Sequence, residues 1–141
     1  AKRETTDTIV IHCTQTPPNM DIDVDKVTQW HKERGFDTIG YHFLIKRDGT
    51  LQEGRQQDEV GAHAVAVNGN SIGVAMVGGG TPNMGWEDNF APIQFETLKT
   101  IIMKLKEDYN IEKVIGHYQV DDKKECPSFD VPKWLKKHNL E

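Results

Sequence analysis

Four short runs of apolar, largely β-branched residues predict strands along the chain. They cover residues 8–12, 41–46, 72–77 and 113–116. The run at 72–77 is nearly continuous, which is typical of a central strand covered on both faces. After the second run, Asp48-Gly49 is a two-residue hairpin signal, and residues 50–53 supply the return strand.

Helical spacing fills the intervals between these strands. Val24, Val27 and Trp30 segregate from their charged neighbours and predict a first helix. Pro92 opens the longest helix, because proline is favoured in a first helical turn. One apolar stripe runs along that helix and consists of Phe95, Leu98, Ile101, Ile102, Leu105 and Tyr109. A short last helix is entered through Pro132.

Strands interleaved with helices, together with one hairpin, predict an α/β fold. We expect a single domain over residues 1–141, with a mixed central β-sheet flanked by helices. A chain of 141 residues buries a sufficient core without disulfides. Cys13 and Cys126 are therefore not interpreted as a disulfide framework.

The charge and hydropathy of the sequence argue against two classes of binding partner. The net charge is -5 and the sequence contains no basic stripe, which argues against direct nucleic-acid binding. No apolar run is long enough to cross a bilayer, so we expect no membrane partner. The first residues carry charge with no apolar stretch behind them, and this pattern is unlike a secretory signal.

Two histidines at strand ends and one cysteine are the candidate functional residues. His12 and His117 each end a predicted strand, and Cys126 follows His117 in a loop with Pro127. Two imidazoles and a thiolate suit zinc, and three protein ligands leave a fourth position for water. The residues are far apart in sequence and form no compact zinc signature. Two alternatives stay open here: a buried structural thiol, and a cysteine peptidase with Cys126 as nucleophile and His117 as base.

A series of ordered motifs adds a family resemblance to this pattern. The motifs are Ile11-His12-Cys13-Thr14, residues 30–35, residues 40–50, Gly54-Arg55, Val60-Gly61-Ala62-His63, residues 70–74 and Cys126-Pro127-Ser128-Phe129-Asp130. In this order they resemble the type 2 N-acetylmuramoyl-L-alanine amidases. The branch is that of the small phage lysozymes of amidase type (endolysins), which are related to peptidoglycan recognition proteins. The resemblance extends from about Ile9 to Trp134.

The resemblance implies Zn2+ bound by His12, His117 and Cys126. It also implies hydrolysis of the peptidoglycan amide between the lactyl group of N-acetylmuramic acid and L-alanine. The family uses a tyrosine and a lysine that match Tyr41 and Lys124. Lys124 would stabilise the developing oxyanion, and Tyr41 would hydrogen-bond the attacking water or the tetrahedral intermediate.

Other polar residues are assigned by position. His63 matches a family segment near the substrate groove, so we expect it to contact substrate. If the first strand continues past His12, the side chain of Cys13 faces the opposite way and packs rather than binding metal. By the same alternation His42 points away from Tyr41 and is structural. His31, on the first helix, is expected at the surface.

The resemblance also sets expectations for partners and location. Peptidoglycan is the expected substrate and a monomer the expected state. One alternative is a non-catalytic peptidoglycan-binding module, although such proteins lack the zinc cysteine that Cys126 matches. Another is an added regulatory role, because phage members of the family can bind an RNA polymerase. Without a secretory signal, an enzyme of this branch would reside in the bacterial host cytoplasm before release to the cell wall.

Overall fold

A five-stranded mixed sheet forms the centre of the computed structural model, which describes residues 1–141. Its strands are β1 (Thr8–Cys13), β2 (Phe43–Ile45), β3 (Leu51–Glu53), β4 (Ser71–Met76) and β5 (Lys113–Gly116), in the order β3-β2-β4-β1-β5. β2, β4, β1 and β5 are parallel, and β3 returns antiparallel to β2. The predicted mixed sheet and its hairpin are confirmed.

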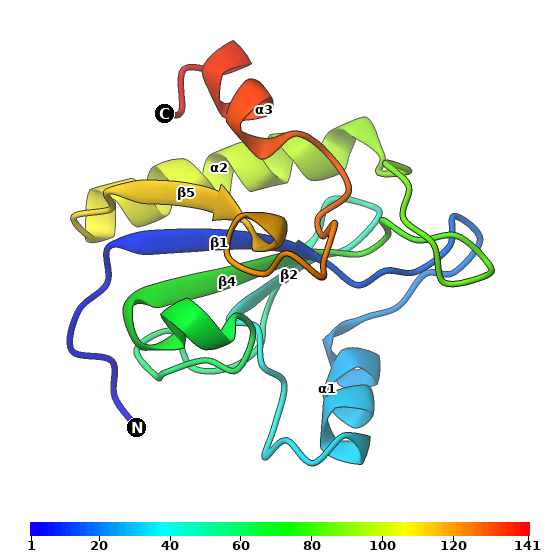
Figure 1. The fold of residues 1–141 in the computed structure, drawn as a ribbon, viewed down its shortest axis with the longest axis horizontal. Helices are drawn as coiled ribbons and strands as arrows, with labels where there is room; N and C mark the ends of the chain where they lie inside the picture. Colours follow the sequence, from blue (N-terminus) through cyan, green and yellow to red (C-terminus); the bar gives the residue numbers. More distant parts are fainter.

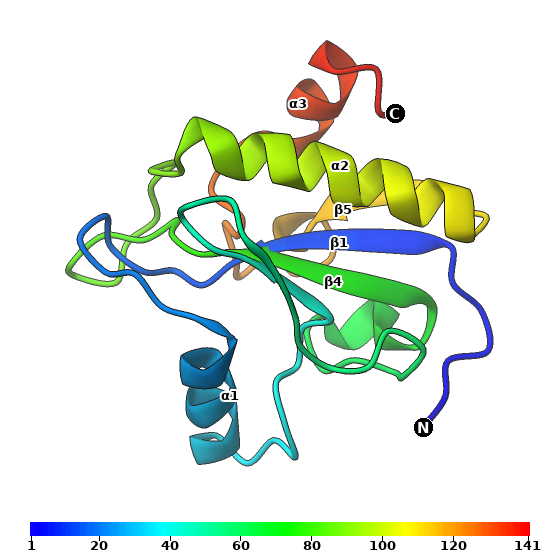
Figure 2. The same cartoon turned by 180° about the vertical axis from the view of Figure 1, so that it is seen from behind.

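Three helices cover the two faces of this sheet. They are α1 (Val24–Glu33), α2 (Pro92–Asp108) and α3 (Val131–Lys137). Two short 3-10 helices are also present: η1 (Val65–Asn70) directly precedes β4, and η2 (His117–Gln119) directly follows β5. α2 and α3 lie on one side of the sheet, whereas α1 lies on the other (Figures 1 and 2). None of the helices combines the length and the apolar character that a bilayer span requires.

The alternation of side chains along β1 assigns its residues to these two faces. Ile9 and Ile11 are fully buried in the core cluster that also contains the α2 residues Leu98 and Ile102. With a period of two, His12 then points to the opposite face, toward α1. This alternation explains why one strand contributes both to the main core and to the cleft described below.

β4 is buried along its whole length, as its continuous apolar pattern predicts. All six of its residues are buried, and it pairs with β1 on one side and β2 on the other. Ile72, Val74 and Met76 belong to the core under α2, whereas Ala75 packs in a second cluster with Val27 of α1. The sheet is therefore a rigid support for the loops at its edges.

The loops that follow the parallel strands gather at one edge of the sheet, to the right of β1 and β5 in Figure 1. The loop after β4 is fixed by Asn89, whose Oδ1 accepts from the Gly79 amide at 2.9 Å and whose Nδ2 donates to the Gly80 carbonyl at 2.7 Å. Gly79 is required there, because its φ is +83° and a Cβ atom would lie 2.5 Å from the Cys13 sulfur. The loop is thus held against the end of β1.

Candidate active site

The sheet brings His12, His117 and Cys126 into one cluster. β1 and β5 are parallel neighbours, and Ile11 lies opposite Gly116. The residues that follow, His12 and His117, are therefore side by side. The two ring centroids are 4.6 Å apart. Nitrogen and sulfur atoms of the three side chains all lie within 4.8 Å of one another. A donor set of two imidazoles and a thiol at this spacing fits zinc.

The surroundings of His12 keep its imidazole neutral. Its side chain is 1% exposed, and its Nε2 atom lies 2.8 Å from Nδ1 of His63. Burial, followed by the neighbouring histidines, holds the pKa of His12 well below its usual value. A neutral ring is the form that binds a metal ion.

Cys126 is enclosed beside the end of β1. Its Sγ accepts a hydrogen bond from the Cys13 amide at 2.9 Å, and its side chain is 4% exposed. Burial, followed by the nearby Cys13 thiol, raises the pKa of Cys126 well above its usual value. A buried thiol with a raised pKa is a poor free nucleophile, whereas a coordinating cation deprotonates it. The site therefore suits metal ligation better than cysteine-peptidase chemistry.

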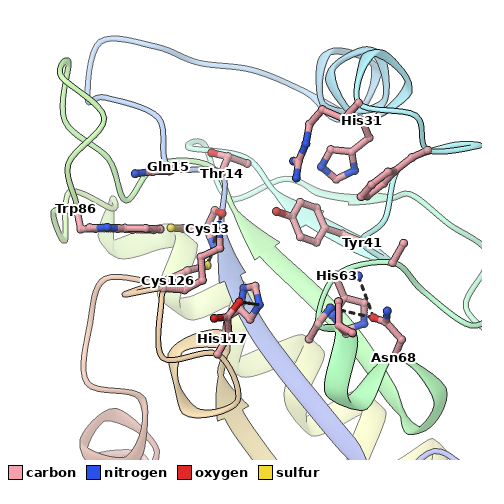
Figure 3. A pocket seen from close by; sticks show the side chains of 17 residues that line it. Cys13, Thr14, Gln15, His31, Tyr41, His63, Asn68, Trp86, His117 and Cys126 are labelled. Atoms are coloured by element: carbon pink, nitrogen blue, oxygen red, sulfur yellow. Dashed lines mark hydrogen bonds and ion pairs between the residues drawn. The ribbon is translucent and has the colours of Figure 1, made fainter.

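A cleft of about 490 Å³ opens above this cluster. His117 and Cys126 line its base, and Trp86 and Tyr41 stand on opposite sides of it (Figure 3). Lys124 also lines the cleft, whereas Lys123 does not, so the structure distinguishes the two adjacent lysines. Tyr41 and Lys124 thus line the same cavity as His117 and Cys126.

Tyr41 lies over the histidines with its hydroxyl toward the cleft (Figure 3). Its ring centroid is 5.0 Å from that of His12 and 5.2 Å from that of His31. Burial raises the pKa of Tyr41 far above its usual value, so the hydroxyl keeps its proton at neutral pH. It is available as a hydrogen-bond donor to a bound substrate.

The expectation that His31 lies at the surface is wrong. Its side chain is 6% exposed and lines the cleft, and its Nδ1 accepts a hydrogen bond from the Gly40 amide at 2.8 Å. The cause is its spacing from Val27, four residues earlier, which places both on the buried face of α1. Trp86, Phe36 and Asn68 also line the cleft, and sequence reasoning did not identify them.

The remaining polar assignments can be located in the fold. Cys13 lies in the last position of β1, with its sulfur 3.8 Å from the Ser128 hydroxyl, and it lines the cleft without belonging to the three-residue cluster. His42 is 1% exposed and does not line the cleft. Its Nδ1 accepts from the Gly73 amide at 3.0 Å, and its Nε2 donates to the Glu59 carbonyl at 2.7 Å. His63 reaches the cleft but is only 9% exposed and is turned against His12.

Three buried neutral histidines give the fold a pH dependence. Burial is the main cause that lowers the pKa of His31 and His42 to about 4 and that of His63 to about 3. An unfolded histidine titrates near 6.5, so between about pH 6.5 and 4 the unfolded chain binds protons that the folded chain does not. The free energy of unfolding therefore falls as the pH falls through this range.

We expect His42 alone to contribute a loss of about 1–2 kcal/mol between pH 7 and pH 5. Urea unfolding of metal-free protein at the two pH values measures the loss. His42→Gln should reduce the difference by that amount, because glutamine does not titrate. An equal pH dependence in the variant and the parent would show that His42 is not responsible.

Parallel strands, a cleft at their carboxyl ends and a polar cluster at its base are the arrangement of an α/β enzyme. Comparison with known proteins specifies the family. Residues 2–129 match the family model described as N-acetylmuramoyl-L-alanine amidase, and the chain belongs to this family.

Individual relatives agree with this assignment. The endolysin of Escherichia phage T7 is 42% identical over 139 residues, which cover 99% of this chain and 91% of that protein. Among solved structures, the N-acetylmuramoyl-L-alanine amidase LysC from Clostridium intestinale superposes with a TM-score of 0.81 at 33% identity, covering 97% of this chain and 87% of LysC. Drosophila PGRP-LB also gives a TM-score of 0.81, at 25% identity, with 99% and 85% covered. The protein is a peptidoglycan amidase of the endolysin type.

Proposed function

We propose that this amidase depends on one zinc ion held by His12, His117 and Cys126. The observation that carries the proposal is the convergence of two neutral imidazoles and a buried thiol, all within 4.8 Å, at the base of the cleft. When bound there, zinc would polarise the scissile carbonyl and lower the pKa of a water molecule. The bond cleaved is the amide that joins the lactyl group of N-acetylmuramic acid to L-alanine.

Two further side chains would act on the reacting carbonyl. Negative charge develops on its oxygen as the amide is attacked, and donors already in place stabilise that charge without reorganisation. Lys124 brings a positive charge to the cleft, and Tyr41 brings a hydroxyl that keeps its proton. We propose that Lys124 stabilises the oxyanion. Tyr41 would hydrogen-bond the attacking water or the tetrahedral intermediate.

A cysteine peptidase is the alternative that uses the same residues. It would need Cys126 as a reactive thiolate, with His117 as its base. The enclosed position of Cys126 and its raised pKa argue against that role. A non-catalytic binding module is also disfavoured, because the chain keeps all three candidate ligands and belongs to an amidase family.

Metal removal and thiol alkylation separate the zinc amidase from the peptidase. We expect a strong chelator to abolish release of peptides from purified peptidoglycan, and added zinc to restore it. Iodoacetamide applied to the zinc-loaded enzyme should leave activity unchanged, because coordination and burial protect Cys126. Mass spectrometry reports which cysteines are modified. Full activity after complete metal removal would defeat the zinc mechanism, and inactivation by alkylation of Cys126 in metal-free enzyme that is otherwise active would favour the peptidase.

Two expectations drawn from the family resemblance stay predictions. One is association with an RNA polymerase, which co-purification from infected cells would test. The other is residence in the bacterial host cytoplasm before release to the cell wall. Neither affects the assignment of the cleft, because peptidoglycan is the substrate in both cases.

A further inference from the structure

A buried line of hydrogen bonds runs from His12 away from the cleft. His12 Nε2 lies 2.8 Å from His63 Nδ1, and His63 Nε2 lies 3.3 Å from the Ser71 hydroxyl. The Ser71 hydroxyl in turn lies 2.7 Å from the carbonyl oxygen of Val67, within η1. The side chains in this line are between 0% and 9% exposed. Bulk water therefore does not compete for these hydrogen bonds.

The carbonyl at the far end fixes the direction of every bond in the line. A carbonyl oxygen only accepts, so the single hydroxyl proton of Ser71 is committed to Val67. The Ser71 oxygen can then only accept from His63, which places the His63 proton on Nε2. The Nδ1 atom of His63 is consequently a lone pair, and it accepts a proton from Nε2 of His12.

This polarity decides which atom of His12 can bind a metal. A neutral imidazole carries one N–H and one lone pair. With the proton on Nε2, the lone pair of His12 is on Nδ1. A metal ligand must present a lone pair, and its other nitrogen is generally held by a partner. His12 meets this condition before any metal is bound.

Glycines and an asparagine keep the His63 ring in place. A Cβ atom at Gly73 would lie 2.7 Å from the ring of His63, and one at Gly61 would lie 2.6 Å from it. The ring therefore occupies a slot that only residues without side chains leave open. The backbone of the same segment is fixed by Asn68, whose Oδ1 accepts from the amides of His63 and Ala64 at 3.0 and 2.9 Å.

We propose that His63 is a positioning residue which, anchored through Ser71 to the Val67 carbonyl, fixes the tautomer of His12 so that Nδ1 faces the metal. The inference rests on the proposed zinc site and deepens it. It gives His63 a role that acts through His12, and the substrate contact expected from the sequence stays a prediction. His117 has no equivalent support, because Asp121 is 3.8 Å from its Nε2, beyond hydrogen-bonding distance.

Zinc affinity, measured by competition with a chromophoric chelator, tests the proposal without any assay of activity. Loss of an outer partner of a metal ligand typically weakens binding about 10–100-fold, and we expect this for His63→Ala. His63→Asn should recover much of the affinity, because its amide oxygen can accept near the position of Nδ1. Ser71→Ala should fall between His63→Ala and the parent. His138→Ala, at the end of α3, is the control for loss of a histidine elsewhere.

Nitrogen NMR of the metal-free protein reads the tautomer directly. In the parent, we expect both His12 and His63 to carry their protons on Nε2. In His63→Ala, His12 should become a mixture of tautomers, while His63→Asn should keep the proton of His12 on Nε2. Circular dichroism checks that each variant is folded. If removal of the His63 ring disturbs the slot, Ser71→Ala still tests the proposal, because it removes the anchor of His63 and leaves the ring in place.

Two results would overturn the proposal. One is a His12 proton on Nδ1 in the metal-free parent. The other is zinc affinity in folded His63→Ala or Ser71→Ala within twofold of the parent. A parent that binds no zinc, yet shows the expected tautomers, would instead defeat the proposed metal dependence and leave the hydrogen-bonded line intact. The two failures are therefore distinguishable.

Discussion

Cys126→Ser should abolish both zinc binding and the release of peptides from peptidoglycan. Serine has nearly the same shape and can occupy the buried position beside the Cys13 amide, but its hydroxyl is not deprotonated at neutral pH. The site would lose its one anionic, soft ligand, and zinc is held poorly by the two histidines alone. We expect activity to fall by several orders of magnitude, because the chemistry that the metal supplies is lost.

Zinc content by atomic emission, measured with the peptide-release assay, checks this result. Cys13→Ser is the matched control, since Cys13 is an equally buried thiol that lies 3.8 Å from the Ser128 hydroxyl and is not one of the three candidate ligands. The control should retain one zinc ion per chain. A Cys126→Ser protein that keeps both zinc and lysis would remove Cys126 from the metal site.

Tyr41→Phe should separate chemistry from metal binding. The substitution removes only the hydroxyl and leaves the ring against His12 and His31, so zinc should stay bound at one ion per chain. Removal of a single donor from a site that stabilises developing charge typically lowers turnover about 10²–10³-fold. We expect the loss to appear in kcat, because the hydroxyl is proposed to act on the transition state and not on zinc.

The control for this substitution lies on the far side of the sheet. Tyr109 accepts a hydrogen bond from Gln57 at 2.9 Å and does not line the cleft, so Tyr109→Phe should leave turnover unchanged. A Tyr41→Phe enzyme with full turnover would exclude the hydroxyl from the chemistry. Loss of zinc together with activity would show that Tyr41 acts by supporting the site.

The sequence pattern predicted the strands and helices well because the core is organised by simple periods. Residues 72–77 were expected to form a covered central strand, and β4 (Ser71–Met76) is that strand within one residue. The stripe along α2 also lies in the core, where Leu98, Ile102 and Leu105 are at most 1% exposed. Period alone could not predict the strand order, because β1 pairs with β4 and β5, which follow it by long connections.

The candidate site was predictable in part for the same reason. Strand ends pointed to His12 and His117, but their adjacency depends on the pairing of β1 with β5. His31 was misplaced although its spacing from Val27 contained the signal. The contact between His63 and His12 had no such signal, because His63 lies in a loop without periodicity, in a slot formed by Gly61 and Gly73.

The position of β1 between β4 and β5 has a consequence for the proposed site during synthesis of the chain, because His12 lies far from His117 and Cys126 in the sequence. An unfinished chain that lacks residues 117–126 has His12 but neither of the side chains that converge on it, and one edge of β1 is still unpaired. Contacts between distant segments form only after both have left the ribosome. With the proposed ligand set, the nascent protein gains activity toward the wall only after residues 117–126 have been synthesised.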